Sequence, residues 1–250
     1  MPLQTRAGPL TGDLILPPPF TLVRLRELGD AFAHAISIAA ERGAGTLVYV
    51  GRFDLAEFAV VLEPDEPLAQ ARRAFYAGMA ALAEALVAHA QPETEIAIDW
   101  PDSFSVNRGL VGGGRLAWPQ GTKENETPAW LVFGAMIRTV SVSGTDPGLN
   151  PLVTALEEEG FSDARADHGG ESFARHFMVA IDAWQEKGFG AVARSYLERL
   201  PADQGVRRDI DETGDLLIRR MGQTQAERAP LLARLAKPAW FDPVTKGPRT

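Results

Sequence analysis

Apolar residues recur along the chain with two different spacings, which divide it into helices and strands. A spacing of three or four residues is typical of a helix with one buried face, whereas compact or alternating apolar runs are typical of strands. The first pattern predicts helices at residues 22–42, 67–90, 151–159, 172–187 and 189–200. The second predicts strands at residues 46–50, 57–62, 95–100, 110–118, 129–142 and 215–220.

This order of elements predicts a mixed α/β fold with a mostly antiparallel sheet flanked by helices, because consecutive strands are joined by short turns. Residues 1–20 should form an extended N-terminal arm, since three prolines at positions 17–19 favour polyproline geometry. Residues 21–200 should form the main domain. Residues 201–250 should form a small C-terminal unit whose end is pinned by the aromatic residues near position 240.

Composition narrows the class of protein. The 250 residues contain no cysteine, which excludes disulfides, thiolate metal sites and cysteine nucleophiles. A net charge of −8 argues against nucleic acid or an anionic membrane surface as the partner. The sequence contains no run of 18 apolar residues, so it predicts no transmembrane helix. The first residues lack a signal-peptide pattern. We therefore expect a cytoplasmic protein.

Three consecutive glycines, Gly112 to Gly114, lie in the middle of a predicted strand. Each glycine in a strand costs roughly 0.5–1 kcal/mol relative to alanine, so the run needs a physical reason. Either the strand bends or bulges, or another group approaches its main chain closely. Trp100 and Asp102 lie just upstream and offer an apolar surface with one polar group, which favours a ligand site.

Short motifs in this region resemble the biotin/lipoate protein ligase family. Trp100-Pro101-Asp102, the turn at Asn107-Arg108-Gly109 and Leu110-Val111-Gly112-Gly113 are similar to the family's K-W-P-N-D strand, turn and K-x-x-G-I-L-type strand. Gly134 stands where the family has G-x-G-I-N, and Gly51-Arg52-Phe53-Asp54 stands where it has the G-R-G-R-x-G loop. The resemblance implies the fold of the ligase catalytic domain.

The resemblance also implies an activity. Family members activate biotin or a lipoyl-type acid with ATP to an acyl-adenylate, and then transfer the acyl group to a lysine of a carrier domain. Related transferases move an octanoyl group between carrier proteins. The implied partners are therefore a small carboxylic acid such as biotin, lipoate or octanoate, and a carrier protein domain. The implied cosubstrate is ATP. Mg²⁺ held by Asp99 or Asp102 together with phosphate is compatible with the sequence, which does not require it.

Site residues follow from the same motifs. The resemblance places the acid against Trp100, Asp102, Gly112, Gly113, Gly114, Arg115 and Gly134. It places the nucleotide against Gly51, Arg52 and Arg138. It identifies no catalytic residue.

The sequence departs from the family pattern at its lysines. Asp99 and Gly109 stand at two positions where the family has lysine. Arg52, Arg115 and Arg138 are candidate replacements, because arginine binds carboxylate and phosphate bidentately. Three hypotheses remain: a divergent ligase or acyltransferase, a non-catalytic relative that binds a small molecule or a carrier domain, and a structural interaction module.

Overall fold

The computed structural model of the chain describes residues 14–141, 152–161 and 166–249. Residues 1–13 of the predicted N-terminal arm lie outside the described residues. No helix in these ranges is long and apolar enough to cross a membrane.

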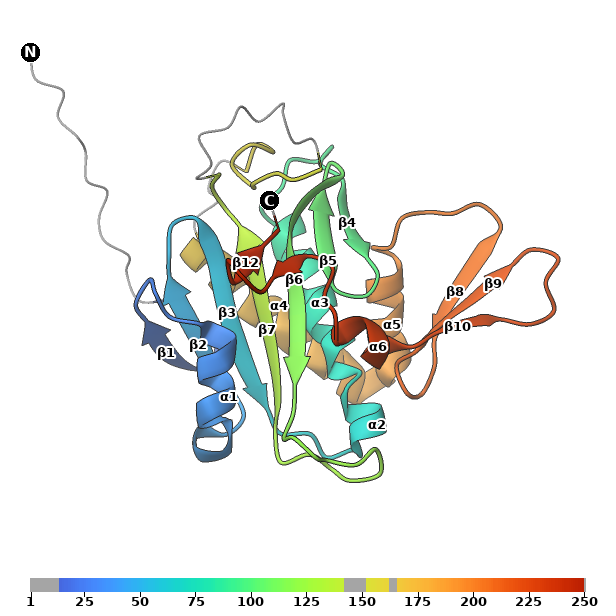
Figure 1. The fold of residues 1–250 in the computed structure, drawn as a ribbon, viewed down its shortest axis with the longest axis horizontal. Coiled ribbons are helices and arrows are strands. Elements are labelled where there is room, and N and C mark those ends of the chain that lie inside the picture. Colours follow the sequence, from blue (N-terminus) through green and yellow to red (C-terminus); the bar gives the residue numbers. More distant parts are fainter. Residues whose placement is uncertain (1–13, 142–151, 162–165, 250) are drawn as a thin grey trace, which may run out of the picture.

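A seven-stranded sheet forms the centre of the molecule, in the order β1-β2-β3-β7-β6-β5-β4 (Figure 1). Its strands are β1 Thr21–Leu25, β2 Thr46–Gly51, β3 Leu55–Leu62, β4 Ile96–Asp99, β5 Ser103–Val106, β6 Gly109–Ala117 and β7 Leu131–Arg138. All neighbouring strands are antiparallel except β1 and β2, which are parallel. This architecture confirms the predicted mixed α/β class.

Helices cover both faces of the sheet (Figure 1). They are α1 Ala31–Arg42, α2 Leu68–Ala71, α3 Ala74–Val87, α4 Ala166–Lys187 and α5 Phe189–Leu197. The larger hydrophobic cluster joins the sheet to α3, α4 and α5. A smaller cluster lies on the other face, where Ala31, Ala35 and Ala39 of α1 pack on β2, β3 and β7.

The C-terminal residues form a small sheet and then return to the large one. The elements are β8 Val206–Ile210, β9 Leu216–Arg220, β10 Glu227–Ala229, α6 Leu231–Leu235, β11 Phe241–Asp242 and β12 Gly247–Pro248. Ile210, Leu216 and Leu231 join the larger hydrophobic cluster. Beyond α6 the chain crosses the large sheet, and β12 lies over β6 and β7 (Figure 1). A separate unit from residue 201 onwards stays a prediction.

Some elements differ from the sequence-based expectation. The helix predicted at 22–42 is wrong in its first part, because Thr21–Leu25 instead pairs with β2 and Asp30 begins α1 by accepting a hydrogen bond from the Ala33 amide (2.8 Å). Strand pairing outweighs a helical spacing that is only a weak local preference. The helix predicted at 67–90 is interrupted between α2 and α3. Residues 152–159 form an isolated bridge and turns rather than a helix.

Candidate functional site

Neighbouring strands bring the predicted site residues together. Gly112 to Arg115 lie on β6, and Gly134 and Arg138 lie on the adjacent β7, where Arg115 and Gly134 are register partners. Trp100 and Asp102 lie in the turn between β4 and β5, and Ser103 of β5 pairs with Gly113. Gly51 and Arg52 lie where β2 turns into β3. Leu55 of β3 pairs with Arg138 of β7, so residues 83 positions apart in the sequence are neighbours across the sheet.

The three glycines of β6 serve different purposes. Gly112 has φ +155°, and a Cβ there would overlap the main-chain carbonyl of Met136, so it accommodates the irregular pairing between β5 and β6. A Cβ on Gly114 would contact Met79 and Phe133 on the α3 side. A Cβ on Gly113 would instead collide with the Asp102 carbonyl and the Trp240 indole. The bulge and the close approach that the sequence suggested as alternatives therefore both occur.

The indole that covers Gly113 comes from the end of the chain. Trp240 is fully buried, and its Cδ1 and Nε1 lie 2.5 Å from the position that a Cβ on Gly113 would take. Trp100 points elsewhere, because its indole Nε1 donates a long 3.4 Å hydrogen bond to the Tyr76 hydroxyl of α3. Residues 238–249, here called the C-terminal strap, therefore cover the bare main chain of β6.

Arg115 is a mostly buried cation at the centre of the site. Its side chain is 16% exposed, and its Cζ lies 4.4 Å from the Phe32 ring of α1 and 4.6 Å from the Phe241 ring of the strap. The Asp30 carboxylate lies 3.9 Å from Nη2. Burial lowers the pKa of Arg115, although Asp30 and Glu57 oppose this change. Its Nε has no hydrogen-bond partner among the described residues.

Glu57 is a buried carboxylate of the site that sequence reasoning missed. It is 2% exposed on β3 and accepts a 2.7 Å hydrogen bond from the Ala31 amide at the start of α1. Burial raises the pKa of Glu57, and the Ala31 amide and the nearby Arg52 and Arg115 partly oppose the rise. The available signal was a single acid inside an otherwise apolar strand, since acids are almost never fully buried without a partner.

Asp102 is a second buried carboxylate. It is 2% exposed, and its Oδ1 accepts a 3.3 Å hydrogen bond from the Ser103 hydroxyl. Oδ2 has no partner among the described residues. Burial raises the pKa of Asp102 to about 7, and Ser103, Arg234 and the Trp240 indole only partly oppose the rise. The charge of Asp102 therefore changes near neutrality.

The two predicted nucleotide-binding arginines are held by groups of the chain itself. Arg52 donates to both carboxylate oxygens of Asp54, from Nε at 3.0 Å and from Nη2 at 2.7 Å, and these bonds raise its pKa. Arg138 donates from Nη2 to the carbonyl oxygens of Pro248 and Arg249, each at 3.0 Å. The described residues contain no group of three or more acidic or histidine side chains placed to hold a metal ion.

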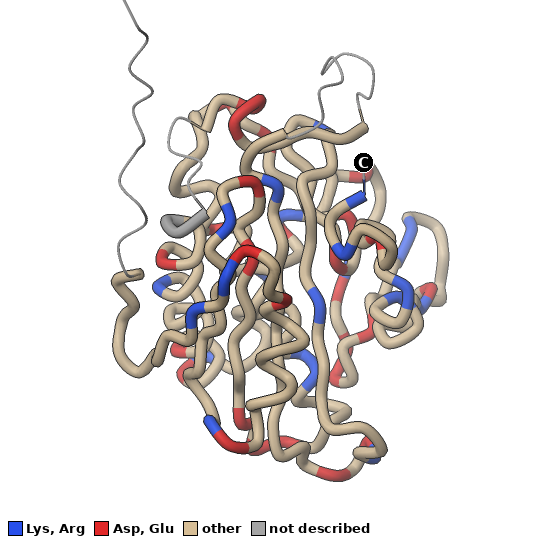
Figure 2. Tube along the Cα trace, turned by 60° about the vertical axis from the view of Figure 1, so that its left-hand side comes forward, with Lys and Arg blue, Asp and Glu red and all other residues tan. Residues whose placement is uncertain are grey.

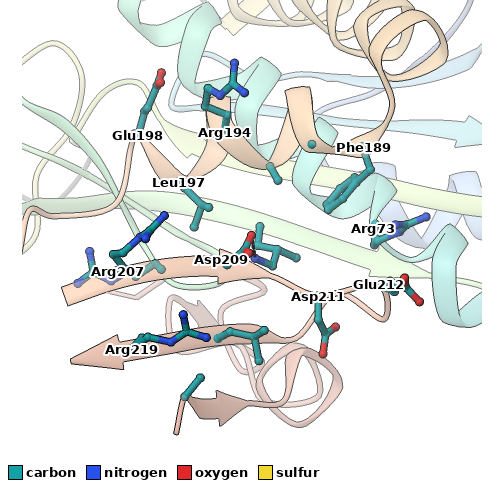
Figure 3. Close-up of a pocket in the computed structure, with 16 residues that line it drawn as sticks. Arg73, Phe189, Arg194, Leu197, Glu198, Arg207, Asp209, Asp211, Glu212 and Arg219 are labelled. Atoms are coloured by element: carbon teal, nitrogen blue, oxygen red, sulfur yellow. Dashed lines mark hydrogen bonds between the residues drawn. The ribbon is translucent and has the colours of Figure 1, made fainter. Parts of the chain in front are cut away.

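A hollow lies between α5 and the small sheet (Figure 3). Its volume is about 810 Å³, and its charged lining residues are Arg73, Arg194, Arg207, Arg208, Arg219, Glu198, Asp209, Asp211 and Glu212. Both signs of charge line it, as they alternate along the rest of the trace (Figure 2). This mixed lining favours neither an anionic nor a cationic ligand.

The comparisons with known proteins agree with the arrangement of these strands. A family model described as biotin/lipoate A/B protein ligase family matches residues 16–198, which is well over half of the chain. This chain belongs to that family. No curated protein sequence matches it. The family assignment confirms the resemblance found in the sequence motifs.

Solved structures show the same fold. A biotin protein ligase-like protein of unknown function from Silicibacter sp. TM1040 is 27% identical, with a TM-score of 0.74 over 88% of this chain and 98% of that chain. Biotin protein ligase from Aquifex aeolicus in complex with biotin and ATP is 13% identical, with a TM-score of 0.59 over 83% and 97% of the two chains. The Leishmania major ligase in complex with biotinyl-5-AMP is 14% identical, with a TM-score of 0.50 over 86% and 99%.

Proposed function

We propose that this member of the biotin/lipoate ligase family binds a cofactor-type carboxylic acid, such as biotin, lipoate or octanoate, on the face of β6 and β7 between α1 and the C-terminal strap. The apolar body of the acid would lie along the main chain at Gly113, beside the Phe32 ring of α1 that covers Gly134. Its carboxylate would meet Arg115. The Aquifex aeolicus ligase of the same fold in complex with biotin and ATP supports this class of ligand.

The observation that carries the proposal is the environment of Arg115. Its guanidinium is mostly buried, packs between two aromatic rings, and keeps an unpartnered Nε–H among the described residues. A buried donor without an acceptor costs free energy. A carboxylate placed against that N–H would form a charge-assisted hydrogen bond, which is stronger than a neutral one.

For the reaction, we propose that ATP, with Mg²⁺, converts the acid to its acyl-adenylate and releases pyrophosphate, as the family resemblance implies. The amine of a carrier-protein lysine would then displace AMP and form an amide with the acyl group. Arg52 and Arg138 lie at the same end of the sheet, where each interacts with Asp54 electrostatically. To bind a nucleotide phosphate, Arg52 would have to give up its hydrogen bonds to Asp54. Arg138 would have to give up its hydrogen bonds to the strap carbonyls.

The alternative is a relative that binds the acid or a carrier domain without turnover. The environment of Gly109, one of the two positions where the family motif has lysine, favours it. A Cβ at Gly109 would lie 2.5 Å from Cγ2 and 2.8 Å from Cβ of Thr154. A lysine would therefore fit only after Thr154 moved, and no lysine replaces it at the other motif position, Asp99.

Calorimetry and a pyrophosphate assay separate the two functions. Titration with biotin, lipoate and octanoate should show binding of at least one acid, and failure of all three would contradict the binding proposal. Pyrophosphate released from ATP only when that acid is present would establish activation. Binding without pyrophosphate release would favour the non-catalytic alternative. Arg115→Ala should weaken acid binding by about tenfold or more, and should lower the acid-dependent pyrophosphate release, if both signals come from this site.

A further inference from the structure

We infer that the C-terminal strap is an internal occupant of the acid site, which must leave before the acid can bind. The inference rests on the proposed function and adds a regulatory step to it. Two contacts between the strap and the site residues carry the argument, together with the polar atoms that closure leaves unpaired.

The first contact fills the space above the bare strand. Trp240 is fully buried against Gly113, at a position that the proposal gives to the apolar body of the acid. Phe241 packs against the Trp240 ring, with centroids 5.5 Å apart and an interplanar angle of 70°, and stacks on Arg115. One aromatic pair therefore covers both Gly113 and the proposed carboxylate-binding side chain.

The second contact uses main-chain oxygens. The carbonyls of Pro248 and Arg249 each accept a 3.0 Å hydrogen bond from Arg138 Nη2. These carbonyls thus occupy the guanidinium of Arg138, which the family resemblance assigns to nucleotide binding. The Arg249 amide donates to the Trp240 carbonyl at 2.7 Å, which ties the two ends of the strap together. The strap thus places an apolar ring on Gly113 and two carbonyl oxygens on Arg138. A ligand with an apolar acyl chain and an anionic end would make contacts of the same two kinds.

The third observation concerns what closure leaves unpaired. Among the described residues, the buried side-chain polar atoms without a hydrogen-bond partner are Asp102 Oδ2, Arg115 Nε and Trp240 Nε1. Trp240 belongs to the strap itself, and Asp102 and Arg115 each lie against one of its rings. The Trp240 indole lies close enough to the Asp102 carboxyl to lower its pKa, whereas Arg115 Nε has no acceptor among the described residues and keeps its full desolvation cost. The closed strap is therefore a costly arrangement that a ligand with matching acceptors can displace.

Opening the strap need not unfold the protein. Trp240 is buried but belongs to none of the three hydrophobic clusters of the described residues. Val244, at the tip of the strap, is 88% exposed. A site that is closed most of the time binds its ligand with an affinity reduced by the fraction of molecules that are open.

The test compares Trp240→Ala with Val244→Ala in the full-length protein. Hydrogen exchange of residues 238–249 should become faster in Trp240→Ala and remain unchanged in Val244→Ala. By calorimetry, Trp240→Ala should bind the best of biotin, lipoate and octanoate at least tenfold more tightly than the wild type. Faster exchange with unchanged affinity would overturn the strap inference and leave the proposed function standing.

A second measurement needs no variant and decides the matter if Trp240→Ala does not fold. Saturating the wild type with the same acid should make the amides of residues 238–249 exchange faster, although ligands usually protect the segments they touch. Slower or unchanged exchange would overturn the inference. If none of the three acids binds to either protein, the proposed function fails and the inference fails with it.

Discussion

Arg115 and Asp102 are buried ionisable groups beside the strap, Arg115 against Phe241 and Asp102 near Trp240, and burial shifts their pKa values in opposite directions. Burial lowers the pKa of the guanidinium and raises the pKa of the carboxyl, because in both groups it disfavours the charged form. Arg115 stays charged at any physiological pH, since a guanidinium keeps its proton far above that range. Asp102 instead changes its charge near neutrality, so the two residues predict different experiments.

Arg115→Ala should weaken binding of the carboxylic acid by about tenfold or more, because a hydrogen bond to a charged group contributes about 1.5–3 kcal/mol. Isothermal calorimetry measures the change. Arg42→Ala is the matched control, because that arginine lies in the last turn of α1 with its side chain 58% exposed. Equal affinity of Arg115→Ala and the wild type would remove Arg115 from the site.

Asp102→Asn should change how stability depends on pH. The raised pKa means that the folded protein keeps this proton up to about pH 7, whereas the unfolded chain releases it near pH 4. Asp102 therefore lowers the free energy of unfolding as pH rises from about 4 to about 7, by on the order of a few kcal/mol. In Asp102→Asn the side chain does not titrate, so this decrease in the free energy of unfolding should be absent.

Urea unfolding at several pH values tests this prediction. The stability of Asp102→Asn relative to the wild type should grow between pH 4 and pH 7 and then stay constant. Ser103→Ala removes the hydroxyl that holds the pKa of Asp102 down, so it should extend the window to higher pH. A stability difference that does not vary with pH would show that Asp102 is ionised in the folded protein.

At the scale of elements, β6 combines a bulge with two sites of close packing. Its three glycines face β7, the strap and α3 respectively, so each accommodates a different neighbour. A side chain at Gly113 would meet both a main-chain carbonyl and Trp240. Gly113→Val therefore tests packing as much as ligand binding, and it is a poor probe of function.

The hairpin of β8 and β9 carries a like-charge pair that predicts a stabilising substitution. Arg207 and Arg219 are direct register partners and both are exposed. Like charges directly opposite each other destabilise a strand pair. Arg219→Glu should raise the free energy of unfolding by about 0.5 kcal/mol, as urea denaturation can measure. Arg219→Gln should give about half of that gain, and a loss of stability would contradict the argument.

At the scale of the molecule, the C-terminal residues share the core of the main sheet. Leu231 is fully buried in the larger cluster, and its amide donates to Asp215 at 2.9 Å. Leu231→Ala should therefore cost roughly 2–5 kcal/mol and lower the midpoint of a single unfolding transition. Met221→Ala, at a side chain that is 87% exposed, is the control. A separate early transition for residues 201–250 would instead favour an independent unit.

The sequence by itself determined the fold class, the family and most strands. These features depend on local apolar spacing and on short motifs, which can be recognised in the sequence alone. The hairpin turn at Asn107 and Arg108 is an example, because both residues have positive φ and the flanking strands pair directly. The misassigned segment at Thr21–Leu25 depends on pairing with β2, which no local pattern contains.

Only the tertiary structure decided what lies on the glycine strand. The indole nearest to Gly113 in the sequence is Trp100, yet Trp100 faces α3 and Trp240 covers the glycine. The same holds for the partners of Arg115, which come from α1 and from the end of the chain. Contacts between residues more than eighty positions apart depend on how the whole chain packs, and spacing along the sequence carries no record of them.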